Sequence, residues 1–287
     1  MSTVLLVAHH ERSEVRQLVR TAADWLAARS HTAVLTADDA AALDLADLAV
    51  ESLPESVDLA VSLGGDGTML RTVQLLGGTG APIIGVNVGH LGYLTEVEPP
   101  TLPSALDRWF AGPSSGEWAI DERMLLDITV RSPRGDAEQT FTALNEGVVE
   151  KHEPGHTIRM LVSIGGTPFT SYAADGLILA TPTGSTAYSM SARGPVVSPR
   201  LRAVLLTPVS PHMLFDRTLV LDPSEQVEVE LLGHRTAILS VDGQPVASLG
   251  EGDMVAVAPS LQVARFVRFG GRGFHQILKA KFGLADR

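Results

Sequence analysis

The chain has 287 residues, enough for two domains, and its 45% hydrophobic and 19% charged content is typical of a globular protein with a core. Its 22 Lys and Arg against 33 Asp and Glu give a net charge of −11, which argues against a general binder of nucleic acid or anionic membranes. The absence of cysteine excludes disulfides, thiolate metal sites and cysteine nucleophiles.

The first hundred residues alternate between short apolar strands and amphipathic helices. This pattern indicates a parallel sheet with helices on its faces, and ligands bind such sheets at the carboxyl ends of the strands. We therefore expect residues 1–117 to form a Rossmann-like α/β domain. The predicted strands are 4–8, 32–36, 59–63 and 82–88, and the predicted helices are 13–28, 38–49, 68–76 and 102–110.

After Trp118 the pattern changes to one strand after another, separated by turn residues such as Asp242-Gly243, a two-residue hairpin signal. We expect residues 118–258 to form a mostly antiparallel, β-sandwich-like domain. Residues 259–287 contain a predicted helix at 274–282 and are expected to pack back on the first domain. The predicted strands are 125–130, 139–144, 148–150, 158–164, 177–180, 203–207, 218–221, 226–231, 237–241 and 254–257.

A glycine-rich stretch, Gly64-Gly65-Asp66-Gly67-Thr68, lies between a predicted strand and a predicted helix. Glycine lets another molecule approach the backbone closely, and the amides at a helix start face a phosphate. A carboxylate repels phosphate, so Asp66 indicates a bridging metal ion or a group that orients and deprotonates an attacking hydroxyl. The stretch predicts phosphoryl transfer to an alcohol. The alternative is a tight Asp-Gly turn without chemistry.

This stretch resembles the signature shared by NAD kinases, diacylglycerol-type lipid kinases and, more distantly, phosphofructokinases. Three further stretches resemble NAD kinases: NVGHLGYLTE at 87–96, LNEGVVEK at 144–151 and DGLILATPTGSTAYSMSARGPVVSP at 175–199. Lipid kinases share the first motif but lack the TPTGSTAY run. From about residue 4 to its end, the chain is similar to bacterial, actinobacterial-like NAD kinases, which implies a phosphofructokinase-like first domain.

The resemblance implies an enzyme that transfers a phosphoryl group from ATP, or from inorganic polyphosphate, to the 2′-hydroxyl of the adenosine ribose of NAD. It also implies a divalent cation, Mg²⁺, that screens the donor's charge, and a homodimer or homotetramer. With no apolar run of roughly 20 residues and no basic leader, we expect a cytoplasmic protein with no membrane or nucleic-acid partner. A lipid kinase and a non-catalytic nucleotide-binding module are the alternatives; the second would be expected to lack Asp66.

The family's pattern implies site residues at matching positions. Asp66 is the predicted catalytic residue, a base or aligning group beside the 2′-hydroxyl. Asn145 would read the adenine edge, Glu146 the ribose hydroxyls, and Asp175 the nicotinamide half, often across a subunit interface. The predicted phosphate-binding residues are Gly64, Gly65, Gly67 and Thr68. The predicted NAD-binding residues are Asp66, Gly67, Arg71, Asn145, Glu146, His156, Asp175, Thr183, Thr186, Ala187, Tyr188, Ser191 and Gln244.

Several of these residues also have a simpler interpretation. Arg71 could simply lie on a solvated helix face, and His156 could lie in a solvated loop. Ser185 or Thr186 could cap a helix. The string HEPGH at 152–156 matches a zinc motif that requires a helix. Pro154 disfavours a helix there, so no metal ligands are predicted.

One position differs among the relatives that the chain resembles. Two residues before Asp175, some NAD kinases carry arginine and are restricted to NAD and ATP. Others carry a small residue and also accept NADH and polyphosphate. This chain has Ala173 at that position, which leaves room beside the nicotinamide ring and predicts that NADH is phosphorylated alongside NAD.

Overall fold

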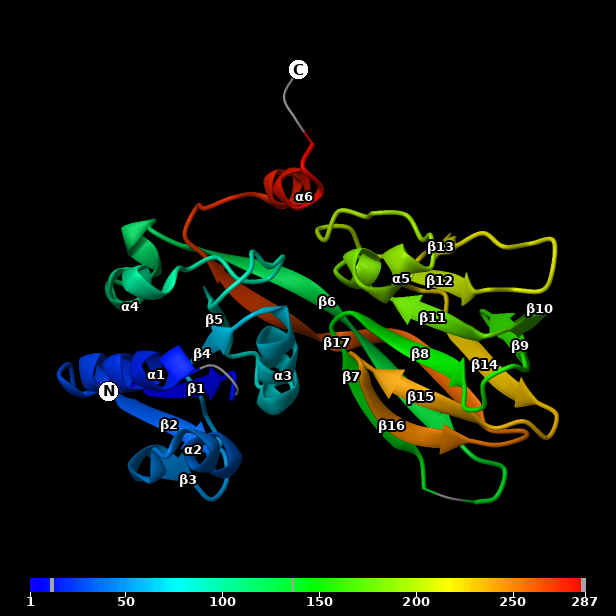
Figure 1. The fold of residues 1–287 in the computed structure, drawn as a ribbon, viewed down its shortest axis with the longest axis horizontal. Helices are drawn as coiled ribbons and strands as arrows, with labels where there is room; N and C mark the ends of the chain where they lie inside the picture. Colours follow the sequence, from blue (N-terminus) through cyan, green and yellow to red (C-terminus); the bar gives the residue numbers. More distant parts are fainter. Residues whose placement is uncertain (11–12, 136, 285–287) are drawn as a thin grey trace. The chain divides into compact units, whose positions relative to one another are not determined.

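The computed structural model describes residues 1–10, 13–135 and 137–284, and contacts divide the chain into two compact units. The first comprises Met1–Glu122 and Ala264–Arg287, and the second comprises Arg123–Val263. Strands β6 (Ala119–Arg131) and β17 (Met254–Arg268) each carry the chain from one unit to the other (Figure 1). Within the described part of the chain, no helix has the length and apolar character needed to cross a membrane.

The first unit is an α/β domain built on a parallel sheet. Its strands lie in the order β5-β4-β1-β2-β3, every neighbouring pair is parallel, and the last residues of β17 add to β5 in the same sense. Strand β4 is buried over its whole length, as central parallel strands are. The strands are β1 (Thr3–Ala8), β2 (Thr32–Thr36), β3 (Ala49–Val50), β4 (Leu59–Gly64) and β5 (Pro82–Asn87).

Helices α1, α2, α3 and α4 pack their apolar faces on the sheet; Val15 and Val19 of α1, for example, share one core cluster with Leu6 of β1. The helix predicted over 38–49 is wrong in its second half. Helix α2 ends where Asp44 adopts a left-handed φ of 53°, and a 3₁₀ turn (Ala46–Leu48) and strand β3 follow. The helices are α1 (Ser13–Ala27), α2 (Ala37–Leu43), α3 (Asp66–Leu76), α4 (Leu102–Phe110) and α6 (Phe274–Phe282), with 3₁₀ turns at Pro99–Thr101 and Pro113–Ser115.

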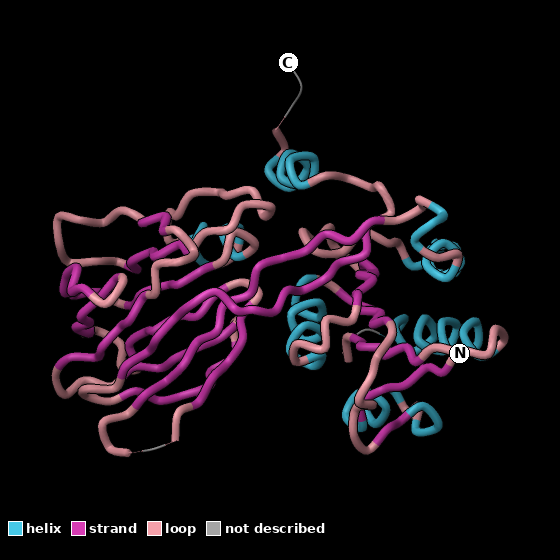
Figure 2. The backbone as a smooth tube through the Cα atoms, turned by 180° about the vertical axis from the view of Figure 1, so that it is seen from behind, coloured by secondary structure: helices cyan, strands magenta, loops and turns pink. Residues whose placement is uncertain are grey.

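The second unit consists of antiparallel sheets. One has six strands in the order β13-β12-β11-β8-β15-β16; the other contains β10-β9-β14-β17, with β6 paired to β17 and β7. Figure 2 shows that this unit is made up mostly of strands. The strands are β7 (Gln139–Ala143), β8 (Glu146–Lys151), β9 (Ile158–Ile164), β10 (Thr167–Ala174), β11 (Gly176–Ala180), β12 (Val204–Val209), β13 (Leu219–Leu221), β14 (Val227–Leu232), β15 (Ala237–Val241) and β16 (Gln244–Leu249). A 3₁₀ turn (Gly184–Thr186) and the short helix α5 (Tyr188–Ser191) complete it.

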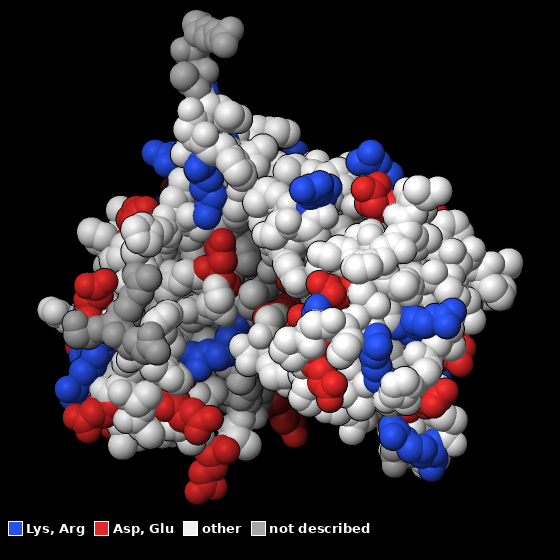
Figure 3. All heavy atoms as spheres, turned by 45° about the vertical axis from the view of Figure 1, so that its right-hand side comes forward, with Lys and Arg blue, Asp and Glu red and all other residues white. Residues whose placement is uncertain are grey.

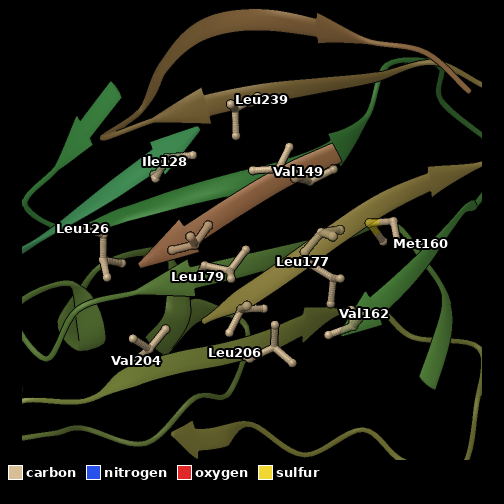
Figure 4. Packing of buried hydrophobic residues seen from close by; sticks show 14 of the residues in the cluster. Leu126, Ile128, Val149, Met160, Val162, Leu177, Leu179, Val204, Leu206 and Leu239 are labelled. Atoms are coloured by element: carbon tan, nitrogen blue, oxygen red, sulfur yellow. The ribbon is translucent and has the colours of Figure 1, made fainter. Parts of the chain in front are cut away.

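The core of the second unit lies between these sheets. Leu177 and Leu179 of β11 point toward Met160 and Val162 of β9 across a layer of buried aliphatic side chains (Figure 4). The predicted fold class, a mostly parallel α/β domain followed by an antiparallel β domain, is confirmed. The sequence analysis missed β10, β16 and residues 258–268 of β17, of which it predicted only 254–257.

Candidate active site

The glycine-rich stretch forms the junction between β4 and α3. Gly64 ends the strand, and a Cβ at this position would lie 2.1 Å from Thr68 Oγ1, so only glycine fits without movement. The carbonyl of Gly65 accepts hydrogen bonds from the N–H groups of Thr68 and Met69, both at 3.1 Å, and begins the helix. The helix thus starts at Asp66, two residues earlier than predicted. The junction lies at the carboxyl edge of the parallel sheet, where ligands bind.

Asp66 is held in place by the backbone of the segment that follows β5. Its two carboxylate oxygens accept hydrogen bonds from the N–H groups of Tyr93 and Leu94, each at 2.9 Å. Gly92 lies against the same carboxylate, because a Cβ there would be 2.3 Å from Asp66 Oδ1. The NVGHLGYLTE stretch therefore fixes the predicted catalytic carboxylate. The sequence analysis singled out this stretch for its resemblance and did not anticipate this contact.

Arg71, one turn into α3, bonds to a buried carboxylate. Asp39 is fully buried and accepts from Arg71 Nη1 at 2.7 Å and from Nη2 at 2.9 Å. Arg71 Nη2 also donates to the carbonyl of Ala8 at 2.6 Å, and His10 Nε2 lies 2.5 Å from Asp39 Oδ1. A buried carboxylate requires such partners. The guanidinium is thus anchored at the end of β1, and its contact with a substrate phosphate stays a prediction. Asp39 was missed by the sequence analysis.

In the second unit, Asn145 and Glu146 lie where β7 gives way to β8. The N–H groups of Leu144, Asn145 and Glu146 all donate to the carboxylate of Asp242, at 2.8, 2.7 and 3.1 Å. On the other side, Thr181 Oγ1 donates to the carbonyl of Leu144 at 2.6 Å. The Asn145 side chain is half-buried, whereas that of Glu146 is buried and its Oε2 has no hydrogen-bond partner.

The TPTGSTAY run packs directly against this segment. A Cβ on Gly184 would lie 2.2 Å from the carbonyl oxygen of Asn145, and the backbone N–H of Tyr188 bonds to the Glu146 carboxyl. The predicted helix caps are wrong, because Ser185 Oγ bonds to the backbone of Val197 and the four-residue helix α5 has no side-chain cap. Thr183 is buried, Thr186 and Ala187 are half-buried, and Tyr188 and Ser191 are exposed.

The remaining predicted residues lie around the ends of β8, β11 and β15. Lys151 Nζ is 2.6 Å from Asp175 Oδ1. Gln244 is exposed and follows the Asp242-Gly243 turn at the start of β16. His156 is exposed and lines a pocket of about 300 Å³. The pocket lining consists of Lys151, Glu153, His156, Ile158, His234, Arg235 and Thr236.

Burial raises the pKa values of Glu146, Asp242 and Tyr188 in this part of the second unit. Burial, and then the nearby carboxylate of Asp242, raise the pKa of Glu146 from 4.5 to about 8. Tyr188 is 40% exposed, and the partial burial of its side chain still raises its pKa; the charges of Glu150 and Asp175 add to this effect. Near neutral pH, Glu146 is therefore largely a protonated acid that can donate as well as accept a hydrogen bond.

The raised pKa of Glu146 predicts a pH-dependent stability. Between pH 4.5 and about 8 the folded protein retains a proton that the unfolded chain releases, so raising the pH across this window lowers the free energy of unfolding. Glu146→Gln removes this titration. As the pH rises, the free energy of unfolding of wild type should therefore fall relative to that of Glu146→Gln, by up to about 1.4 kcal/mol per pH unit. Urea denaturation of both proteins at a series of pH values measures it, and parallel curves would contradict it.

The charges outside these clusters are mixed. Over the face drawn in Figure 3, the described Lys and Arg side chains lie among Asp and Glu and do not gather into one broad basic area.

Among residues 1–10, 13–135 and 137–284, no group of three or more His, Asp or Glu side chains is arranged to hold a metal ion.

Comparison with known proteins relates these clusters to one family. The models of the ATP-NAD kinase N-terminal and C-terminal domains match residues 4–113 and 144–269. The NAD kinase of Heliobacterium modesticaldum is 40% identical over 98% of both chains. This chain belongs to the NAD kinase family. The NAD kinase of Moorella thermoacetica is 39% identical over 98% of this chain and 89% of its own.

Two solved structures of the NAD kinase type have a similar fold. An NAD kinase from Archaeoglobus fulgidus in complex with ATP matches with a TM-score of 0.70 and 26% identity, over 98% of this chain and 97% of its own. Yeast NADH kinase complexed with NADH matches with a TM-score of 0.85 over 100% of this chain and 89% of its own; at 24% identity this likeness concerns the fold alone. Membership of the NAD kinase family decides against the lipid-kinase alternative.

Proposed function

We propose that this chain phosphorylates the 2′-hydroxyl of the adenosine ribose of NAD, with ATP or inorganic polyphosphate as the donor, and so produces NADP. The observation that carries the proposal is the carboxylate of Asp66, fixed by two backbone N–H groups beside a glycine-rich strand end. A carboxylate in this setting suits the alignment and deprotonation of a hydroxyl. Full-length membership of the NAD kinase family identifies that hydroxyl as one of NAD.

In this proposal, the chain acts mainly by positioning two substrates and neutralising charge. Asp66 orients the 2′-hydroxyl and accepts its proton. The backbone amides of the glycine-rich stretch at the start of α3 face the donor's phosphates. Asn145 hydrogen-bonds the adenine edge and Glu146 the ribose hydroxyls, while Tyr188 and its neighbours in the TPTGSTAY run line the adenosine pocket.

The charge of the donor's phosphates would be screened by a divalent cation, which we propose is Mg²⁺. Mg²⁺ keeps several water ligands and binds through substrate phosphates and one or two carboxylates, so a dedicated cluster of protein ligands is not required. A homodimer or homotetramer in the cytoplasm stays a prediction.

The direct test is to incubate the protein with NAD, Mg²⁺ and either ATP or polyphosphate, and to detect NADP with an NADP-specific dehydrogenase. We expect NADP with at least one donor and none without a donor. A folded protein that binds NAD but forms no NADP with either donor would instead support the non-catalytic binding module.

Asn145→Ala should raise the KM for NAD several-fold, because one hydrogen bond to an uncharged base contributes about 0.5–1.5 kcal/mol. The apparent KM for the donor should change little, since Asn145 is assigned to the adenine of NAD. Steady-state kinetics with each substrate varied in turn measures both constants. Equal increases in the two constants would indicate a general disturbance of the segment before β8.

Ala173→Arg should depress the reaction with NADH more than the reaction with NAD. Ala173 lies on β10, two residues before Asp175, and is half-buried. In this proposal its small side chain leaves room beside the nicotinamide ring that an arginine would fill with a cation. We expect wild type to phosphorylate NADH measurably. The measurement is kcat/KM for both acceptors in both proteins. If wild type does not phosphorylate NADH, or if the variant loses both reactions in proportion, Ala173 does not determine the choice between NAD and NADH.

A further inference from the structure

The turn between β15 and β16 contains a buried carboxylate that the hairpin itself does not need. Asp242 and Gly243 have φ values of 47° and 80°, as a two-residue turn with two left-handed positions requires. Asparagine or glycine would serve such a turn equally well. Asp242 nevertheless turns its carboxylate inward and is only 7% exposed.

The carboxylate of Asp242 connects this turn to a segment about a hundred residues earlier in the chain. Oδ1 accepts from the N–H groups of Asn145 and Glu146, and Oδ2 accepts from the N–H of Leu144. The N–H of Asp242 donates in return to the carbonyl of Glu146 at 3.0 Å. Burial raises the pKa of Asp242, while the three donated hydrogen bonds act in the opposite direction.

The carbonyl side of the same segment is held as well. Thr181 Oγ1 donates to the carbonyl of Leu144 at 2.6 Å, and the N–H of Thr181 donates to the carbonyl of Asn145 at 2.8 Å. The backbone N–H and C=O groups of this short segment therefore have fixed partners on both sides. Because these hydrogen bonds fix the backbone of residues 144–146, they also determine the direction in which its side chains point.

We propose that Asp242 is a positioning residue for nucleotide binding: its carboxylate fixes the backbone of residues 144–146 so that the Asn145 amide and the Glu146 carboxyl face NAD. The inference rests on the proposed function, because it assigns those two side chains to the adenosine half of NAD. Asp242 itself does not need to contact the substrate.

Substitution of Asp242 tests the inference in graded steps. Asp242→Asn keeps Oδ1 and suits a left-handed turn, so the hairpin should fold, but its amide group faces the N–H of Leu144. Asp242→Ala removes all three acceptor contacts. We expect the KM for NAD to rise in the order wild type, Asn, Ala, by roughly 10- to 100-fold for Ala. The donor KM and the kcat at saturating NAD should change by less than about 3-fold.

Asp253 provides a matched control in the next turn of the same unit. It is 2% exposed, and its Oδ2 accepts from the N–H of Gly250 and from Arg134 Nη2, at 2.7 and 2.6 Å. Asp253→Asn should lower the melting temperature as Asp242→Asn does, without the rise in the KM for NAD.

The inference is overturned if Asp242→Asn raises the KM for NAD no more than Asp253→Asn does. It is also overturned if kcat and both KM values deteriorate together, because that pattern indicates a structural role alone. A wild type that makes no NADP would instead refute the proposed function. In that case, NAD affinities of the same variants from titration calorimetry decide the inference.

Discussion

Asp66→Asn should lower kcat by roughly 10²- to 10⁴-fold while leaving the affinity for NAD within a few-fold of wild type. In its proposed role as a base or aligning group, Asp66 would act on the transition state more than on the bound substrate. The two N–H groups of Tyr93 and Leu94 hold its oxygens in one orientation, so the carboxylate is placed before the substrate arrives. Because the carboxylate is preorganised in this way, its loss should lower the reaction rate strongly.

The control for Asp66→Asn is Asp38→Asn, which removes the exposed carboxylate of Asp38 in the first turn of α2 and changes the net charge equally. Steady-state kinetics and calorimetric titration with NAD on the three proteins separate turnover from binding. Near-normal turnover in Asp66→Asn would remove Asp66 from the chemistry. Lost NAD binding in a folded variant would make it a binding residue instead.

The alternation of elements in the first unit could be predicted because its central strands are fully buried. A strand such as β4, covered on both sides, is a continuous apolar run between turn residues, and the helices between such strands show an apolar stripe. The error at 38–49 has a local cause. Ala-rich residues favour helix on both sides of Asp44, but its left-handed backbone ends the helix there.

The missed strands β10 and β16 are the ones that sequence patterns describe poorly. Both lie at an edge of their sheet, both carry proline at their second residue, and half of the residues of each are exposed. Proline is tolerated on edge strands because one side of the strand has no hydrogen-bonding neighbour. Exposure removes the alternation of apolar and polar residues on which strand prediction depends.

The site could be predicted only in part, because the residues that support it lie far from it along the chain. Motif resemblance identified Asp66, Arg71 and Asn145, whose roles stay predictions. Their supports could not be found in this way: the backbone that holds Asp66 lies 27 and 28 residues away, and Asp39 lies 32 residues from Arg71. Asp242 lies 97 residues from Asn145. Such partners depend on the fold, and backbone donors have no residue signature at all.

Gly92→Ala should lower kcat by roughly 100-fold, although Gly92 takes no part in the chemistry, because a displacement of about 1 Å at a reacting group can have an effect of this size. The new Cβ would lie 2.3 Å from Asp66 Oδ1 and 2.9 Å from Thr95 Oγ1, so the carboxylate, the segment or both must move. Gly92 has no left-handed φ, so the effect arises from this contact and not from backbone strain. The overpacking should also lower stability by about 1–3 kcal/mol.

Gly273→Ala is the matched control for Gly92→Ala. Gly273 belongs to the same unit, has a φ of −70° that alanine adopts, and has no atom within 4 Å of an added Cβ. We expect this variant to retain wild-type kcat and to lose at most about 1 kcal/mol of stability, because alanine is a poorer N-cap of α6 than glycine. Turnover at saturating NAD and donor, measured below the melting temperature of every variant, isolates the displacement of Asp66 from unfolding. If Gly92→Ala is destabilised yet has a normal kcat, the segment after β5 has shifted to accommodate the new methyl group without moving the Asp66 carboxylate. In that case, the two N–H groups of Tyr93 and Leu94 hold Asp66 more firmly than the close contact with residue 92 can displace it.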